Sequence, residues 1–339
     1  MSIKISYILP CYNVGRFITD TLGSLYAQGM PEDEFEVICV NDCSTDDTHD
    51  RIAAFAEGHA NLILLDQPRN MYSGAARNRG LEVAQGEYIW FVDSDDQAKP
   101  GVAPKLLELA CAENLDLLLF NYEEFPDGHP EEAKPARAIF RETEVMDGGT
   151  FVHTVFKDRL TRLSLLWLRL FRRGLIEEYK IRFPDLYISQ DCPFAWESLL
   201  LARRVKAIPD RCYLYRASAG SITANKNTAK KAAVWSFQFP YELERVKKAV
   251  EGKVPDGIVR GIDRNIRHEV NQFAKRYVQL PGKEKSAYFQ AMRTDRNWFP
   301  RFKSSLTRRN RLVYRSGFLG ERVFGAVSKQ WMGKDHSSK

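Results

Sequence analysis

Two aspartates one residue apart, Asp93 and Asp95, are the residues of this 339-residue chain whose spacing most clearly permits chemistry. They follow residues 88–92, an apolar run that predicts a strand buried on both faces. Mg²⁺ and Mn²⁺ prefer hard oxygen ligands, and one or two carboxylates can hold a metal whose coordination a diphosphate completes. Three aspartates after a buried strand, Asp96 included, are electrostatically costly without a cation. The turn therefore predicts a Mn²⁺ or Mg²⁺ site, and a solvated acidic turn is the alternative.

A second polar turn, formed by Asn41 and Asp42, follows another apolar run at residues 35–40. A carboxylate at this place can accept the imide N–H of a uracil ring. The alternative is that Asp42 only shapes the turn, which aspartate does well. Residues 44–47 then read Ser-Thr-Asp-Asp, a pattern typical of a helix N-terminus, so we expect a helix to begin at Ser44.

The elements that must position these turns alternate between strand and helix. Apolar runs predict strands at residues 3–9, 35–40, 62–65, 88–92 and 117–120, and apolar residues at helical spacing predict helices at 16–28, 73–84 and 100–114. This alternation favours an α/β fold with a doubly wound, mostly parallel sheet. Ligands bind such sheets beyond the carboxyl ends of the strands, which is where both polar turns fall.

The rest of the chain is less regular. We expect a strand at 138–145, a partly helical segment at 167–179, a helix at 191–203 and a strand at 205–215. From about Asn227 onward the pattern becomes helical and charged, with Pro255 and Pro281 as breaks. A boundary near Ala224 then separates a first domain, residues 1–224, from a helical, basic C-terminal extension, residues 225–339.

Several motifs occur in an order and with spacings that resemble family 2 glycosyltransferases. Four of them are Pro10-Cys11-Tyr12-Asn13, Asp42-Cys43-Ser44-Thr45-Asp46, Ala76-Arg77-Asn78-Arg79-Gly80 and the run at residues 86–96. Further motifs are Trp167 with Phe171 and Ile176, then Gln190-Asp191-Cys192-Pro193-Phe194, then Tyr213-Leu214-Tyr215-Arg216 and Gly220-Ser221-Ile222-Thr223. The resemblance covers roughly residues 3–223, and an ordered set is far more specific than any single motif.

The resemblance implies a GT-A fold, an inverting mechanism, a UDP-sugar donor and a divalent metal. It assigns donor binding to Pro10, Tyr12, Asn13, Asp42, Asn70, Arg77, Asp93, Ser94 and Arg216, and the metal to Asp95 and Asp93. Asp191 would be the general base, which takes the proton from the acceptor hydroxyl as that oxygen attacks the anomeric carbon. Residues 1–122 would bind the nucleotide sugar, and residues 123–224 would bind the acceptor.

Three positions depart from the family pattern. Asn41 and Gln190 stand where the family has an aspartate and a glutamate, and the segment that follows Asn70 lacks the family's glycine. Arg216 and the turn at residues 220–223 would form a loop that closes on the diphosphate. The alternative is a surface arginine beside an ordinary turn.

The net charge of +6 is concentrated at the C-terminal end, where residues 299–339 contain ten Lys or Arg and two acidic residues. Aromatic and aliphatic side chains lie between these charges, which is typical of segments on anionic membrane surfaces. We expect residues 301–339 to contact the membrane peripherally. The alternative is a helix packed on the first domain with a solvated basic face. No nucleic-acid-binding module accompanies the charge, so no nucleic acid partner is expected.

The expected function is sugar transfer to a hydroxyl of a saccharide or lipid-linked acceptor in cell-surface polysaccharide synthesis. Alternatives are a sugar-nucleotide-binding scaffold without catalysis, and a nucleotidyltransferase or nucleotide-dependent oxidoreductase on a related sheet. Neither Gly-x-Gly-x-x-Gly after the first strand nor a P-loop motif is present. Six cysteines without a Cys-x-x-Cys pair argue against zinc and for a reducing compartment. With no apolar run of membrane-helix length and no secretory signal, we expect a cytoplasmic protein, peripheral on the inner face of the membrane.

Overall fold

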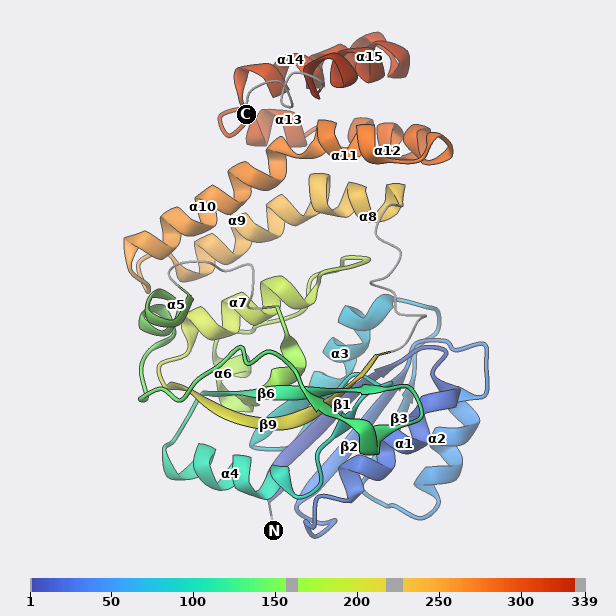
Figure 1. The fold of residues 1–339 in the computed structure, drawn as a ribbon, viewed down its shortest axis with the longest axis vertical. Helices are drawn as coiled ribbons and strands as arrows, with labels where there is room; N and C mark the ends of the chain where they lie inside the picture. Colours follow the sequence, from blue (N-terminus) through green and yellow to red (C-terminus); the bar gives the residue numbers. More distant parts are fainter. Residues whose placement is uncertain (1, 157–163, 218–227, 333–339) are drawn as a thin grey trace. The chain divides into compact units, whose positions relative to one another are not determined.

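The computed structural model describes residues 2–156, 164–217 and 228–332, and the chain forms two compact units. The first unit comprises residues 1–185 and 190–219, and the second comprises residues 186–189 and 220–339. A mixed sheet with flanking helices makes up the first unit, whereas residues 228–332 of the second unit are mainly helical (Figure 1). The sequence motif at residues 220–223 lies outside the described residues.

The first unit is built on a nine-stranded sheet with the strand order β3-β2-β1-β4-β8-β6-β9-β5, and β7 pairs with β6. The strands are β1 Ile5–Cys11, β2 Phe35–Asn41, β3 Leu62–Asp66, β4 Tyr88–Phe91, β5 Gln97–Ala98, β6 Leu117–Pro126, β7 Lys134–Pro135, β8 Arg169–Arg172 and β9 Val205–Ala217. The helices are α1 Gly15–Tyr26, α2 Thr48–Ala56, α3 Tyr72–Val83, α4 Val102–Ala112, α5 Gly148–Phe156, α6 Arg173–Glu178 and α7 Asp191–Leu201.

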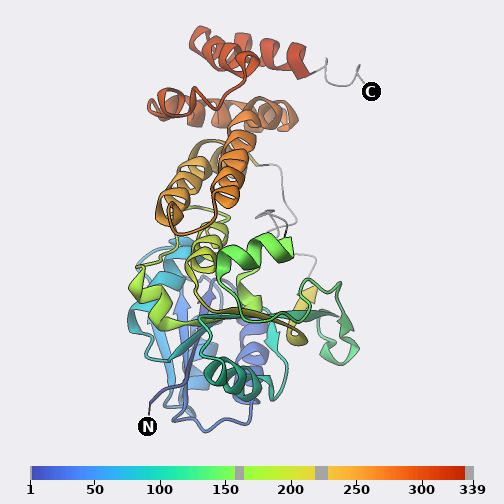
Figure 2. The ribbon, with the colours of Figure 1, turned by 90° about the vertical axis from the view of Figure 1, so that its left-hand side faces the viewer.

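The strands β3, β2, β1 and β4 are parallel, as the alternating pattern predicts. Helices α1 and α3 lie on opposite faces of β1 and β2 (Figures 1 and 2), which is the doubly wound arrangement. The other half of the sheet is mixed, because β8 runs antiparallel between β4 and β6. Residues 169–172 were expected to be partly helical, but their side chains are mostly buried, and they fill the gap between two strands.

Two local predictions are wrong for identifiable reasons. No strand forms at residues 138–145, because the side-chain oxygen of Asn121 accepts the N–H groups of Ile139 and Phe140 at 2.7 and 2.9 Å. Helix α2 begins at Thr48 rather than Ser44. The Ser44 hydroxyl instead accepts the backbone N–H of Asn13 at 3.1 Å, so it serves the loop after β1 and not a helix end.

One buried hydroxyl in β1 gives a stability prediction. Tyr7 is 0% exposed, and its hydroxyl finds no hydrogen-bond partner among the described residues. A buried polar group without a partner costs free energy that a phenyl ring does not, so Tyr7→Phe should raise the free energy of unfolding by about 1 kcal/mol. Urea denaturation measures this value. A lower free energy of unfolding in the variant would show that the hydroxyl has a partner in solution.

The second unit has its own aromatic core. Its elements are α8 Ala229–Ala233, the π-helix η4 Val234–Gln238, α9 Phe239–Val250, α10 Asp256–Asn271, α11 Phe273–Gln279, α12 Gly282–Thr294, α13 Trp298–Phe302, α14 Arg308–Ser316, the 3₁₀ turn η5 Gly317–Leu319 and α15 Glu321–Met332. Pro255 and Pro281 directly precede α10 and α12, so both predicted breaks are confirmed. Helices α9 and α10 lie side by side (Figures 1 and 2). Over residues 2–156, 164–217 and 228–332, each helix is too short or too polar to span a bilayer.

Candidate active site

The polar turns predicted from the sequence meet at the carboxyl ends of β1, β2 and β4. Because β1 pairs with both β2 and β4, the turns that follow these strands are neighbours. The hydroxyl of Ser94 donates to the carbonyl oxygen of Pro10 at 2.8 Å. The side-chain oxygen of Asn13 accepts the backbone N–H of Thr45 at 2.8 Å. These contacts hold the three turns together at one edge of the sheet.

Asp42 is buried beneath the loop that follows β3. It is 2% exposed, and one carboxylate oxygen accepts from the Gln67 side chain at 2.9 Å and from the Met71 backbone N–H at 2.7 Å. Burial raises the pKa of Asp42, and these hydrogen bonds act in the opposite direction. These contacts fix the loop that carries Asn70, whereas within its own turn it is Asn41 whose side-chain oxygen accepts the backbone N–H of Ser44, at 3.1 Å. Tyr12, by contrast, follows β1 at the same edge and is 44% exposed.

Arg77 links helix α3 to the acidic turn. Its guanidinium donates to the Asp93 carboxylate at 2.7 Å and lies 5.6 Å from the ring centroid of Phe183. The next residue, Asn78, exchanges two hydrogen bonds with the backbone of Phe183, each 2.9 Å long. A Cβ at Gly80 would lie 2.5 Å from the Ile8 side chain, so only glycine lets α3 pack this closely on β1. The Ala-Arg-Asn-x-Gly motif thus positions Arg77.

The three aspartates of the acidic turn have different surroundings. Asp96 is buried, and it accepts from the Tyr213 hydroxyl at 3.0 Å and from the backbone N–H of Arg216 at 2.7 Å. Burial, followed by the charge of Asp93, raises the pKa of Asp95 to about 6. No side chain in the described part of the chain donates a hydrogen bond to the Asp95 carboxylate.

A divalent cation fits the pair Asp93 and Asp95. Both offer hard oxygen ligands, and the repulsion between them is the kind that a bound cation removes. Asp96 does not complete a three-residue cluster, because its carboxylate is engaged by Tyr213 and Arg216. Such a site would need ligands from the donor, as Mg²⁺ sites with one or two carboxylates do.

Asp191 lies at the first turn of α7 and interacts electrostatically with the same cluster. Burial raises the pKa of Asp191, the positive charge of Arg77 lowers it, and the negative charge of Asp93 raises it. The close approach of α7 to α3 explains this neighbourhood: the Gln190 side chain donates to the Ser73 hydroxyl. The structure thus brings Asp191 and the acidic turn together.

Arg216 is buried, so the alternative of a surface arginine is wrong. It is 3% exposed, and its Nε donates to the carbonyl oxygen of Asp95 at 2.6 Å. Its Nη1 donates to Asp127 at 3.2 Å, and its guanidinium lies 4.9 Å from the ring centroids of both Phe17 and Phe125. In this conformation Arg216 supports the acidic turn from inside.

The contacts of Arg216 predict a loss of stability in a variant that conserves the charge. Arg216→Lys keeps the charge, but a single ammonium cannot bond Asp95 and Asp127 in the same fork geometry. We expect the free energy of unfolding to fall by about 2 kcal/mol. Arg204→Lys is the matched control, because exposed Arg204 also donates to a backbone carbonyl, that of Glu113 at 3.0 Å. Equal losses from the two variants in urea denaturation would contradict a special role for Arg216.

Two residues that the sequence motifs did not predict also contribute to this edge, Asp127 and Tyr213. Asp127 follows β6 and binds Arg216, but no local pattern marks it. The hydroxyl of Tyr213 accepts the backbone N–H of Asp93 at 3.1 Å and donates to Asp96, so it holds both ends of the acidic turn. The Tyr-x-Tyr-Arg motif contains this residue, but its spacing alone predicts no role for Tyr213.

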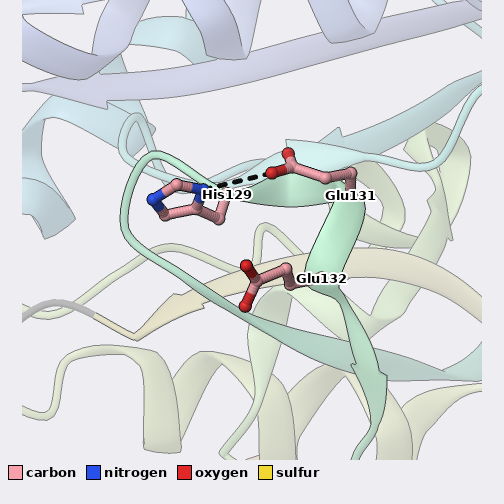
Figure 3. Close-up of side chains that lie close together, drawn as sticks. All are labelled: His129, Glu131 and Glu132. Atoms are coloured by element: carbon pink, nitrogen blue, oxygen red, sulfur yellow. Dashed lines mark hydrogen bonds and ion pairs between the residues drawn. The ribbon is translucent and has the colours of Figure 1, made fainter.

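One group of side chains with metal-binding capacity lies apart from these turns. His129, Glu131 and Glu132 have ligand atoms within 4.8 Å of one another, and His129 Nδ1 lies 3.1 Å from Glu131 (Figure 3). All three are exposed and belong to one short turn. Exposed acidic groups gather in this way without a metal, so no site is assigned to them.

Comparison with known proteins identifies the family. The model of "Glycosyl transferase family 2" matches residues 6–179. A poly(ribitol-phosphate) β-glucosyltransferase of Bacillus spizizenii is 29% identical over 63% of this chain, and the match spans only 32% of that relative. The structure of Staphylococcus aureus TarS 1–349 in complex with UDP-GlcNAc is 20% identical, with a TM-score of 0.66 over 98% of this chain and 92% of that one.

A mannosyltransferase of Pyrobaculum calidifontis in complex with GDP-Man and Mn²⁺ also shares the fold. It is 17% identical, with a TM-score of 0.56 over 97% of this chain and 87% of that one. These structural likenesses show that the expected GT-A fold is present. Because the family model covers half of the sequence, this chain belongs to glycosyl transferase family 2.

Proposed function

We propose that this chain is an inverting glycosyltransferase, which moves a sugar from a UDP-sugar to a hydroxyl of a saccharide or lipid-linked acceptor in cell-surface polysaccharide synthesis. The relatives named above support the reaction class, and the TarS complex with UDP-GlcNAc supports the donor class. Residues 1–224 would form the catalytic domain, with the donor bound by residues 1–122 and the acceptor by residues 123–224.

The observation that carries this proposal is one charged cluster in which Arg77 binds Asp93 and interacts with Asp191. Asp95 and Asp93 would hold Mn²⁺ or Mg²⁺. When bound, the cation offsets the negative charge that develops on the departing diphosphate. Arg77 holds Asp93 in place and keeps a positive charge beside the diphosphate. Tyr12 and Asp42 would line the nucleoside pocket, where Asp42 also fixes the loop after β3.

Asp191 would accept the proton of the acceptor hydroxyl. A general base must lie within hydrogen-bond reach of that proton and must be deprotonated when it acts. Burial raises the pKa of Asp191, which makes it a stronger base than an exposed aspartate, while Arg77 limits the rise. The oxygen then attacks the anomeric carbon from the face opposite the diphosphate, and a single displacement inverts the configuration.

The raised pKa of Asp191 gives a pH prediction. As the pH falls through this pKa, the base becomes protonated and kcat must fall with a slope of one proton. Because the pKa lies above the ordinary 3.8 of an aspartate, the acid limb of the kcat profile should have its midpoint above pH 3.8. Initial rates at saturating donor and metal, measured over an acid-to-neutral series, check this midpoint. A flat profile down to pH 3.8 would argue against Asp191 as the base.

A panel of UDP-, GDP- and dTDP-sugars tests the proposed donor. A ligand that binds the folded state raises the melting temperature, so a UDP-sugar with Mn²⁺ should raise it, and EDTA should remove the effect. UDP should be released when an acceptor takes the sugar. In the absence of an acceptor, hydrolysis of the donor by water should release it. A sugar-nucleotide-binding scaffold would show the shift without UDP release, and the absence of any shift would contradict the proposal.

A further inference from the structure

A group of large apolar side chains is exposed on the second unit, within residues 312–323. They are Leu312, Phe318, Leu319 and Val323, which are 56%, 70%, 75% and 38% exposed, and we call them the apolar patch. Over the described residues, the other large hydrophobic side chain exposed to this degree is Tyr12, in the first unit. Scattered exposed hydrophobic residues are ordinary, but four within twelve residues mark a surface that interacts with something.

The apolar patch borders the core that holds these helices together, and the two meet where the Phe318 ring lies edge-on to Tyr314, with ring centroids 6.0 Å apart. Val313 and Tyr314 of α14 and Phe324 of α15 are buried, and the ring centroids of Tyr314 and Phe324 lie 6.0 and 6.2 Å from that of Phe273. The core thus buries side chains other than those of the patch. One face of these helices packs inside the second unit, whereas the other face carries the exposed side chains.

The turn η5 is the part that presents the apolar patch most strongly. Gly317 is buried, and a Cβ there would lie 2.6 Å from the Met292 side chain, so the backbone is pressed against the core at this point. The next two residues, Phe318 and Leu319, are the most exposed of the patch. Gly320 then has φ 110°, a conformation that favours glycine and turns the chain into α15. Two anchoring glycines thus hold an apolar tip outward.

Positive charge surrounds the apolar patch. Residues 301–330 contain eight Lys or Arg and a single acidic residue, Glu321. Glu321 accepts from the Ser286 hydroxyl at 2.8 Å. The exposed basic side chains are Arg301, Lys303, Arg308, Arg315, Arg322 and Lys329. Arg308 and Arg315 stand four residues before and three after Leu312, so all three share one face of α14.

We propose that the apolar patch inserts into the surface of a bilayer containing anionic phospholipids, with the surrounding arginines and lysines paired to headgroup phosphates. Membrane-surface binding of this kind grows with the apolar area buried and with the number of basic residues near the surface. A second copy of the chain is a poorer occupant, because a symmetric contact would bring two basic rims together. Under the proposed function, this surface would bring the enzyme to lipid-linked acceptors, whereas lipid binding itself does not depend on that function.

Vesicle co-sedimentation of the full chain tests the proposal. Wild type should bind phosphatidylcholine vesicles that contain phosphatidylglycerol, should bind pure phosphatidylcholine far less, and should be released by high salt. The double variant Phe318→Ser/Leu319→Ser should lose about tenfold or more in affinity. Its melting temperature should fall only slightly, because both side chains are mostly exposed and the substitution removes one ring contact, that of Phe318 with Tyr314. Equal binding by the variant, or no preference for anionic vesicles, would overturn the proposal.

Charge variants separate the local basic rim from net charge. Arg308→Gln/Arg315→Gln should weaken vesicle binding about tenfold or more. Arg137→Gln/Arg141→Gln removes the same charge from exposed positions of the first unit and should leave binding unchanged. Sedimentation velocity without vesicles tests whether a second copy of the chain occupies the patch instead. It is run on wild type and on Phe318→Ser/Leu319→Ser. An oligomer that the variant abolishes would reassign the patch to a subunit contact. Neither measurement needs nucleotide or turnover, so failure of the donor assignment would not affect this result.

Discussion

Asp191→Asn should slow sugar transfer by orders of magnitude while leaving donor binding intact. The amide keeps the size of the side chain but cannot accept the hydroxyl proton, and loss of a general base lowers kcat by about 10² to 10⁴-fold. Asp191 interacts with Arg77 but is not one of the proposed metal ligands, so Mn²⁺-dependent binding of the UDP-sugar should persist. Calorimetric titration of the donor and initial-rate kinetics on the same preparation measure both quantities.

Asp185→Asn is the matched control for this experiment. Asp185 is exposed and lies six positions earlier in the chain, so the same substitution there should change kcat less than twofold, roughly the effect of a neutral surface change. If Asp191→Asn retains the rate of the control, the proton acceptor must be another group. A parallel loss of donor affinity would instead mean that Asp191 helps to form the donor pocket.

Asp95→Asn should remove metal-dependent donor binding and, with it, about 10²-fold or more of kcat/KM. An amide oxygen is a weaker ligand than a carboxylate for a hard divalent cation. In the metal-free protein, by contrast, the same substitution should be favourable, because it should increase the stability of the fold. Burial and the neighbouring charge of Asp93 raise the pKa of Asp95 to about 6, so at neutral pH the ionised carboxylate destabilises the fold. Removal of this charge should therefore raise the melting temperature in EDTA.

The sign of that stability effect can be checked across pH. A carboxyl whose pKa is raised in the folded state favours folding while it is protonated, and this contribution is lost as the pH rises through about 6. The melting-temperature advantage of Asp95→Asn in EDTA should therefore be small in acid and larger at neutral pH. Asp50→Asn, at an exposed position of α2, is the control. Unchanged metal-dependent binding in Asp95→Asn would contradict its role as a ligand.

The sequence predicted the first half of the sheet well, because its signals are local. Buried parallel strands such as β2 and β4 are continuous apolar runs, and the turns after them carry the polar residues. The meeting of Asp42 and Asp93 at one edge follows from the parallel direction of those strands. The position of that edge could therefore be predicted from the sequence.

The rest of the fold depends on contacts between distant residues. The direction of β8 is set by its place between β4 and β6, which its four residues do not encode. The failed strand at 138–145 reflects one side chain, Asn121, which supplies hydrogen bonds that a neighbouring strand otherwise would. A pattern of alternating residues cannot reveal either cause.

The same limit applies to the candidate site. Arg216 was expected to face the diphosphate, and its role there stays a prediction. Its burial against Phe17, Phe125 and Asp127 depends on two segments about ninety or more positions away in the chain. Sequence spacing shows which residues can do chemistry, whereas three-dimensional packing decides which of them are already engaged.

A crystal structure with a UDP-sugar and Mn²⁺, with the metal located by its anomalous scattering, tests the central claim most directly. We predict Mn²⁺ bound between the donor diphosphate and the Asp95 carboxylate, with Asp191 facing the anomeric carbon on the side opposite the diphosphate. Manganese at His129, Glu131 and Glu132 instead, or a donor whose anomeric carbon lies out of reach of Asp191, would contradict the account.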